Sequence, residues 1–451
     1  MTTPEIDVNY QNDNGIARSD SIDDKEFEKS LLRKMDFRII PLLTFLYLLK
    51  LILEMHLEED LGLVNDQYNW CLSIFFVGYI FFEVPSNLTL IKTSPSKWIP
   101  STMIFWGITM SLMALVKNYH GLLLARFFLG VFESGLYPGV IFYITMCGLL
   151  AYGIVRLDGK LNLTGWQWLF LIEGVITIVV AFFAYFYIAD YPEKAKWLDD
   201  KERRFATQRL IQDAGKAHII HFDKVQLFEA LKDWKVYMSM IQLCGLSTSL
   251  YSFSFFLPSI VKGLGFDFVI SQLLSVPPFL CGSLSTLFVA ILSDRKRTRA
   301  PFIVILSLIG IVGYILLSVP SFGIAAKYIG ACVVGIGAGP SLVTTITWLT
   351  NNVAGNGKRS VATAMLIAFG NVGGIIGSQI YRPNDAPLYL IGHLKSAIFL
   401  IVLICFTIVQ YYYLKKLNKK KQVDPQSFLE GKSEKEIGDM GDKHPDFIYI
   451  L

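Results

Sequence analysis

The chain is poor in charge and in the residue patterns that enzymes use for catalysis. Only 17% of its 451 residues are Asp, Glu, Lys or Arg, whereas 53% are hydrophobic, and it has six histidines. It contains no HExxH, GxSxG or P-loop pattern, so it lacks the signatures of metalloproteases, serine hydrolases and nucleotide-hydrolysing enzymes. We therefore expect no enzymatic activity and no bound metal or cofactor.

Cysteine is scarce as well, and it is not arranged in pairs. The six cysteines form no CxxC motif, and all fall in or beside apolar runs: Cys71, Cys147, Cys244, Cys281, Cys332 and Cys405. Such cysteines behave as small apolar residues, so we expect neither disulfides nor metal ligands. The net charge of +4 is small and indicates no nucleic-acid partner.

Long apolar runs are what the sequence has in abundance. They separate four charged stretches, and their length is close to the roughly 20 residues that cross the hydrocarbon of a bilayer as a helix. Runs such as WLFLIEGVITIVVAFFAYFYIA have no polar face, unlike a surface helix of a soluble protein. We predict an all-α membrane protein that spans the lipid bilayer at 38–54, 68–90, 99–116, 120–143, 166–188, 236–261, 272–292, 302–319, 323–350, 360–381 and 394–414.

The distribution of Lys and Arg predicts how the chain is organised. Basic residues concentrate on cytoplasmic loops, so both termini, the central stretch and the loop SDRKRTRA should be cytosolic. The predicted units are a disordered cytosolic tail, an N-terminal transmembrane bundle, a cytosolic central loop, a C-terminal transmembrane bundle and a second cytosolic tail, at 1–37, 38–188, 189–235, 236–415 and 416–451.

The number of spans in the first bundle conflicts with this sidedness. Five clear spans between residues 38 and 188 would place the central loop outside, whereas its basic residues place it inside. The apolar block 122–154 is too long for one crossing and too short for two crossings with a turn. A span is therefore missing or malformed between residues 120 and 165.

Several stretches in both halves carry a family resemblance. They are IPLLTFLYLL, EEDLGL, QYNWCLSIFFVGYIFFEVPSNL, RFFLGVFESGLYPG, GWQWLFLIEG, FFLPSIVKGLGF, QLLSVPPFL and SDRKRTRAPF. The chain resembles the fungal allantoate permease family, in the anion:cation symporter branch of the major facilitator superfamily. The resemblance implies two six-helix bundles, alternating access, and uptake of a small carboxylate such as nicotinate, allantoate or pantothenate. It also implies a monomer in the plasma membrane that is driven by protons.

Arg126 and Glu133 are the first candidates for a functional site. A charge in the middle of a membrane helix costs about 2.5–3.5 kcal/mol on insertion scales, so it needs a partner or a function. Seven residues return to nearly the same face of a helix, about 10 Å along its axis. An Arg can hold a carboxylate with two parallel hydrogen bonds, and the resemblance implies substrate binding by Arg126 and proton coupling by Glu133. The alternative is a purely structural pair.

Further polar residues in the spans are weaker candidates. Tyr251, Trp348, Asn371 and Gln379 are expected to line the substrate cavity in the second half, the alternative being simple packing or hydrogen bonding. Glu83 is expected to pack against a basic neighbour.

The loop SDRKRTR resembles the cytosolic loop motif of the superfamily. It is expected to form a conformational latch from Asp294, Arg295 and Arg299.

Two departures from the family leave the activity open. LYLLKLILEMHLEEDLGL lacks about eight residues, two turns of helix, including an Asp-Arg pair of the first helix. YITMCGLLAYGI lacks about thirty, a basic turn and most of the fifth span. We expect the functional protein to be longer. The alternatives are a transport-dead paralogue or a nutrient sensor that keeps the transporter fold.

Overall fold

The computed structural model describes residues 57–64, 66–134, 159–187, 198–205, 224–431, 433, 437 and 440–451, which all fall within the unit Thr44–Leu451. The first predicted span, 38–54, and the junction near residue 150 lie outside them. The first half contains the helices α2 (Leu57–Asp60), α3 (Gln67–Thr93), α4 (Pro95–Met113), α5 (Tyr119–Glu133), η2 (Lys160–Asn162) and α7 (Gly165–Tyr187).

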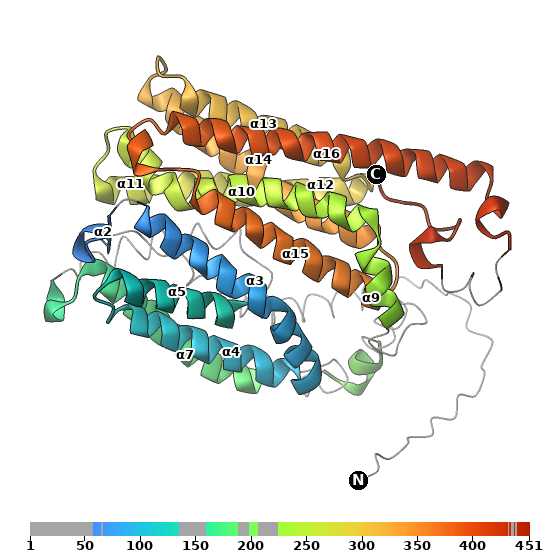
Figure 1. Ribbon diagram of the computed structural model, residues 1–451, viewed down its shortest axis with the longest axis horizontal. Coiled ribbons are helices and arrows are strands. Elements are labelled where there is room, and N and C mark those ends of the chain that lie inside the picture. The colour runs from blue at the N-terminus through green and yellow to red at the C-terminus, as the bar shows by residue number, and fades with distance from the viewer. Residues whose placement is uncertain are drawn as a thin grey trace, which may run out of the picture. The chain divides into compact units, whose positions relative to one another are not determined.

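The second half is a bundle of long helices (Figure 1). After α9 (Lys224–Leu231) come α10 (Trp234–Gly263), α11 (Phe268–Leu274), α12 (Val276–Lys296), α13 (Ala300–Ser318), α14 (Ile324–Asn351), α15 (Asn356–Ser378), η4 (Pro383–Asp385), α16 (Leu390–Val423), η5 (Gln426–Phe428) and η6 (Gly441–Lys443). Within α10–α16, α10 packs on α14, α15 and α16, and α13 packs on α14 and α16. The all-α architecture predicted from the sequence is thereby confirmed.

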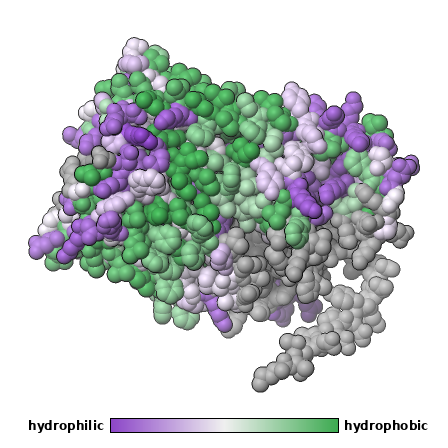
Figure 2. All heavy atoms as spheres, in the orientation of Figure 1, coloured by the Kyte–Doolittle hydropathy of each residue, from purple (hydrophilic) through white to green (hydrophobic). Residues whose placement is uncertain are grey.

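Each predicted span from 68–90 onward overlaps a helix in the described part of the chain. In the described part of the chain, seven helices are long and apolar enough to cross a membrane, judged by length and composition. The predicted spans 68–90, 99–116 and 120–143 overlap α3, α4 and α5, which are not among these seven. Large side chains such as Phe81, Phe105, Phe183, Phe288 and Ile305 are more than half exposed. Figure 2 shows hydrophobic side chains over the middle of one face, with hydrophilic ones gathered toward its two sides. That pattern suits helices whose outer faces meet lipid.

The two ends of the helices differ in charge. The end that carries the loop 294–299 and the C-terminal turns of α16 is called the basic end here. Four basic residues lie in that loop, and five more lie at 415–421. The opposite end of the second half carries the connections 264–267 and 319–323, which have no Lys or Arg, and 379–389, which has Arg382 alone. The charge difference between the ends follows the pattern that predicts sidedness in membrane proteins.

The C-terminal region departs from its predicted boundaries. The last span was expected to end at residue 414, but α16 continues to Val423. Apolar length predicts where a helix leaves the hydrocarbon, whereas Lys-rich sequence can continue the helix in water because Lys is a good helix former. Residues 440–451 then return to the second bundle, where Tyr449 is buried in its core.

Glycines set the distance between α3 and α5. A Cβ atom added to Gly130 on α5 would overlap the carbonyl oxygen of Phe75, and one added to Gly78 on α3 would overlap that of Phe127. The two backbones therefore touch, as small residues allow in membrane helices.

Replacing Gly130 by Ala should destabilise the chain by about 1–3 kcal/mol, because the methyl group must push α5 away from α3. Thermal unfolding in detergent measures the effect. Gly323→Ala is the matched control, since nothing lies within 4 Å of a Cβ at Gly323. Equal unfolding temperatures in the two variants would contradict the close α3–α5 contact.

Candidate functional site

Arg126 and Glu133 lie on the buried face of α5. The helix begins after Asn118, whose side-chain oxygen accepts a hydrogen bond from the backbone N–H of Gly121 at 2.8 Å. Its buried residues are Leu122, Arg126, Leu129, Gly130 and Glu133, which recur at helical spacing on one face. Arg126 is 8% exposed and Glu133 is 3% exposed. The same-face arrangement predicted from their spacing is present, and the roles of the two residues stay predictions.

Packing against α3 sets the depth of these two charges. Gly130 lies beside Phe75 of α3. Arg126 precedes Gly130 by four residues, about one turn of helix, and therefore lies nearer the opposite end than Gly130 does. Glu133 lies nearly one turn nearer the basic end. Arg126 is also within electrostatic range of Cys71 on α3. The two charged groups are therefore stacked along α3, one above and one below the level of Phe75.

A tier of hydrogen bonds joins α3 to the second half at the opposite end. The Asn69 side chain donates to the carbonyl of Tyr381 at 2.9 Å. The hydroxyls of Ser73 and Ser378 lie 2.7 Å apart, and the Gln379 amide donates to the Ser73 hydroxyl at 2.8 Å. We call these five residues the polar tier. Two of them belong to α3, and the other three lie at the end of α15 or directly after it, so the tier ties the two halves together.

An aromatic tier lies one turn deeper along α3. The ring of Phe76 contacts the rings of Tyr251 and Phe255 on α10, with centroids 5.0 and 6.1 Å apart. Gly374 on α15 faces Phe76, whose ring fills the place that a side chain would take. The polar and aromatic tiers close the space between the halves at this end of the helices.

Buried polar groups follow beneath the aromatic tier. Glu83 lies seven residues beyond Phe76, on the same face of α3, and is 3% exposed. Asn371, one turn from Gly374, is 5% exposed. Within the described residues, neither Oε2 of Glu83 nor Nδ2 of Asn371 has a hydrogen-bond partner. Polar atoms that are buried in this way are costly unless they meet a proton, water or ligand.

Tyr251 connects these groups to α5. Its phenol is within electrostatic range of both Glu133 and Glu83, while its ring packs on Phe76. Two carboxylates and a phenol therefore gather beneath the tiers, with Asn371 one turn below Gly374, while Arg126 lies nearer the opposite end, within electrostatic range of Cys71. Such a set can hold a small anion and can take up or release a proton.

The other predicted residues are distributed between the two ends. Gln379 belongs to the polar tier, and Tyr251 and Asn371 lie at or beneath the aromatic tier. Trp348 is not brought to this site: it lies in the last turn of α14, fully buried, and its indole N–H donates to the carbonyl of Ile450 at 2.8 Å. Its position near the end of α14 could be read from the sequence, but its partner could not.

One ion pair expected in the loop 294–299 is present, and its role as a conformational latch stays a prediction. Arg299 makes an ion pair with Asp294 and a hydrogen bond to the hydroxyl of Ser293. Arg295 is exposed. The loop between α12 and α13 is thus held by one of its two predicted arginines.

Several residues of the site were not predicted. Asn69, Ser73 and Phe76 lie in an apolar run and carry no signal of function. Glu83 was assigned a basic neighbour, but none of the ion pairs between described residues includes it. No group of three or more His, Cys, Asp or Glu within the described ranges could hold a metal ion.

Comparison with known proteins shows the family. The model of the Major Facilitator Superfamily matches residues 40–147 and 151–378, and the chain belongs to this superfamily of transporters. It is similar to an uncharacterized transporter of Schizosaccharomyces pombe, with 33% identity over 100% of this chain and 95% of the relative. It is also similar to the high-affinity nicotinic acid transporter of Saccharomyces cerevisiae, with 28% identity over 100% of this chain and 89% of that protein.

A solved structure has the same fold. The crystal structure of a bacterial homologue of the human lysosomal transporter Spinster superposes with a TM-score of 0.61 at 14% identity. The match covers 82% of this chain and 96% of that one.

The comparisons bear on the predicted losses from the first bundle. The two yeast alignments extend over 492 and 485 positions, although this chain has 451 residues. Both relatives therefore carry residues that have no counterpart here. The superfamily match itself is interrupted between residues 147 and 151, at the junction where the sequence predicts most of a span to be missing.

The polar tier predicts a specific cross-link. In a Ser73→Cys, Ser378→Cys variant, mild oxidation should form a disulfide, because the two native hydroxyls are 2.7 Å apart. Counting free thiols by mass spectrometry measures it. Ser73→Cys paired with Ser396→Cys is the control, since Ser396 bonds Ser252 inside the second bundle. Equal oxidation of both pairs would argue against a closed polar tier.

Proposed function

We propose that the chain is a proton-coupled carrier that takes up a small organic anion through a fungal plasma membrane, and that it belongs to the allantoate permease branch of its superfamily. The observation that supports this most is the buried Arg126–Glu133 face of α5 beside Tyr251. A lone buried Arg suits a carboxylate, and an intramembrane Glu suits proton transfer.

The orientation of the proposed carrier follows from its charges. The basic end should be cytosolic, since Lys and Arg are retained on that side. The polar and aromatic tiers would then lie on the extracellular side, which is the side that is closed in an inward-facing carrier. Both termini would be cytosolic.

The proposed cycle uses Glu133 and Arg126 together. Glu133 takes a proton from outside, the anion meets the Arg126 guanidinium, and the tiers close over both. Tyr251, Asn371 and Gln379 line the path from the second half. The proton gradient is the driving force, without a cofactor, and a monomer suffices. Since one relative is named a nicotinic acid transporter, nicotinate is the first substrate to test.

Arg126→Ala should reduce uptake of labelled carboxylate to about one tenth or less, because the only positive charge on the buried face of α5 is removed. The assay uses cells that lack their own carrier, with surface expression measured in parallel. Arg382→Ala, at an exposed arginine, is the control and should retain uptake. Normal uptake by Arg126→Ala would refute the proposed anion site.

Glu133→Gln should abolish the dependence of uptake on external pH while leaving exchange of substrate, since an amide cannot carry the proton. Measuring uptake and exchange between pH 5 and 8 tests this. Glu83→Gln removes the other buried carboxylate near Tyr251 and should keep the pH dependence. If the dependence is lost in Glu83→Gln alone, Glu83 is the coupling residue.

The second candidate is a transport-dead paralogue or a nutrient sensor. The residues present in both yeast relatives but absent here favour it, because the losses predicted from the sequence fall in the first bundle and would leave a gap in its wall. Concentrative uptake by the chain as given distinguishes the two: a carrier accumulates substrate against its gradient, whereas a sensor binds without accumulating it.

A further inference from the structure

Residues 440–451, called the clasp here, are held on the basic end of the second bundle by side chains that hydrogen-bond to the backbone of the clasp. Asn418 on α16 donates to the carbonyl of Tyr449 and accepts from its N–H, both at 2.9 Å. Asn352, which follows α14, does the same with Ile450 at 2.9 and 2.8 Å. Two-way amide bonds of this kind fix the register of an extended segment.

A buried charge cluster holds the beginning of the clasp. Asp442 is 1% exposed and pairs with Lys235 on α10 and with Lys358 on α15 at 2.7 Å. Asp233 joins the same two lysines at 3.1 and 2.8 Å. Two carboxylates therefore lie between two ammonium groups, and all four side chains are largely buried.

Asp442 remains ionised in this environment. Burial alone would raise its pKa, but the charges of Lys235 and Lys358 lower it below the ordinary value of 3.8. The stabilisation from this carboxylate is therefore present above about pH 4 and is lost only as the pH falls through the lowered pKa.

Lys421 fastens the middle of the clasp. Its ammonium group donates to the carbonyls of Asp442, His444 and Phe447 at 2.8, 2.9 and 2.8 Å, so all three of its protons are used. The same group lies 4.3 Å from the centre of the Tyr449 ring. The clasp is thereby wrapped around one buried lysine of α16.

The end of the clasp reaches two further helices. The carbonyl of Ile450 accepts from Trp348 on α14, and that of Leu451 accepts from the backbone N–H of Arg299, the residue before α13. Together with Lys235 on α10, Lys358 on α15 and the α16 contacts, the clasp touches the ends of five helices that are far apart in the sequence.

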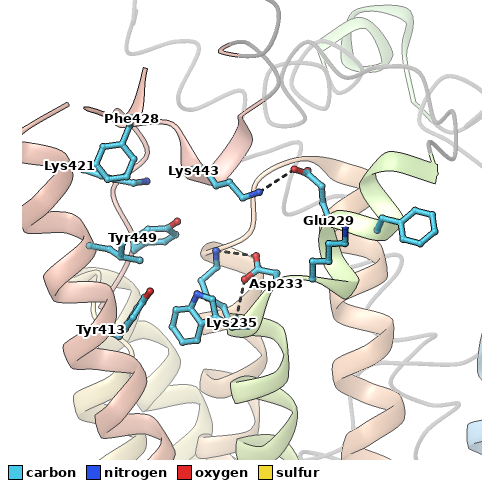
Figure 3. Close-up of a pocket in the computed structure, with 12 residues that line it drawn as sticks. Glu229, Asp233, Lys235, Tyr413, Lys421, Phe428, Lys443 and Tyr449 are labelled. Atoms are coloured by element: carbon cyan, nitrogen blue, oxygen red, sulfur yellow. Dashed lines mark hydrogen bonds and ion pairs between the residues drawn. The ribbon is translucent and has the colours of Figure 1, made fainter. Parts of the chain in front are cut away.

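The clasp packs less closely on α9. A cavity of about 650 Å³ lies between α9, the start of α10, the end of α16 and the clasp (Figure 3). Across it, Lys443 meets Glu229 at 3.4 Å with both side chains partly exposed. The buried lysines that line the cavity, Lys235 and Lys421, already have partners. The strong attachments of the clasp are thus to the bundle and not to α9.

We propose that the clasp braces the basic end of the second bundle, holding α10, α13, α14, α15 and α16 at fixed spacing so that they move as one rigid body, and that the ion pairs of Asp442 keep it closed. This role does not depend on which solute the chain carries. The clasp adds to the close packing between these helices, because apolar side chains gain little by leaving lipid for a neighbouring helix.

The two buried lysines explain why the clasp needs the charge of Asp442. If the carboxylate of Asp442 is neutralised, Lys235 and Lys358 share Asp233 alone, and a buried positive charge is left uncompensated. Breaking a buried pair from one side is strongly destabilising, so the lysines should draw in water and the clasp should detach. The charge at Asp446 offers a matched comparison, since its side chain is 91% exposed.

Hydrogen–deuterium exchange on the full chain in detergent tests the brace. In Asp442→Asn, amides of 447–451 and of the nearest helix turns, at 235–239, 347–351 and 358–362, should exchange about tenfold faster or more. In Asp446→Asn, the same amides should stay within about twofold of the natural chain. The matched pair makes the same chemical change four residues apart.

Two results would overturn the proposal. One is unchanged exchange in Asp442→Asn, and the other is faster exchange in the clasp with no change at the helix ends, which would mean a docked segment without a bracing role. If Asp442→Asn fails to fold, Asn352→Ala removes two hydrogen bonds without stranding a charge. It should speed exchange at 447–451 and at 347–351, and normal exchange there would equally refute the brace.

Discussion

The contact of α3 with both halves is the constraint on which the rest of the site depends. On one side Gly78 and Gly130 bring its backbone against α5, which sets the depth of Arg126 and Glu133. On the other side Ser73 and Phe76 join the second half. The helix α3 therefore contributes residues to both tiers, holds the buried carboxylate of Glu83, and sets the position of α5 along its axis.

Different kinds of interaction stabilise the two ends of the helices. Those at the opposite end join the two halves, and those at the basic end join the helices of the second bundle. The opposite end is closed by neutral hydrogen bonds and aromatic packing, each worth about 0.5–1.5 kcal/mol. Contacts of that size can break and reform during a transport cycle. The basic end of the second bundle is held by compensated buried charges around Asp442, whose loss on one side is much more costly. A reversible gate and a persistent brace are thus built from suitably different interactions.

Much of the fold and part of the site could be predicted because they depend on local pattern. Apolar length predicts the spans, and helical periodicity places Arg126 and Glu133 on one face. Trp348 shows the limit: its aromatic character in an apolar run suggested the substrate path, but its indole serves the C-terminal segment. Which helix face meets which neighbour depends on packing across hundreds of residues, and a single sequence carries no record of it.

The sequence by itself determined where most of the described helices lie and the charge difference between the helix ends, and it indicated the Asp294–Arg299 pair between α12 and α13. These follow from hydrophobic length, charge and motif spacing. Only the tertiary structure decided that Ser73 meets Ser378, that Tyr251 lies near two carboxylates, and that Asp442 is buried between lysines. Those contacts join residues far apart in the chain, and their register is set by interhelical packing, which no local pattern specifies.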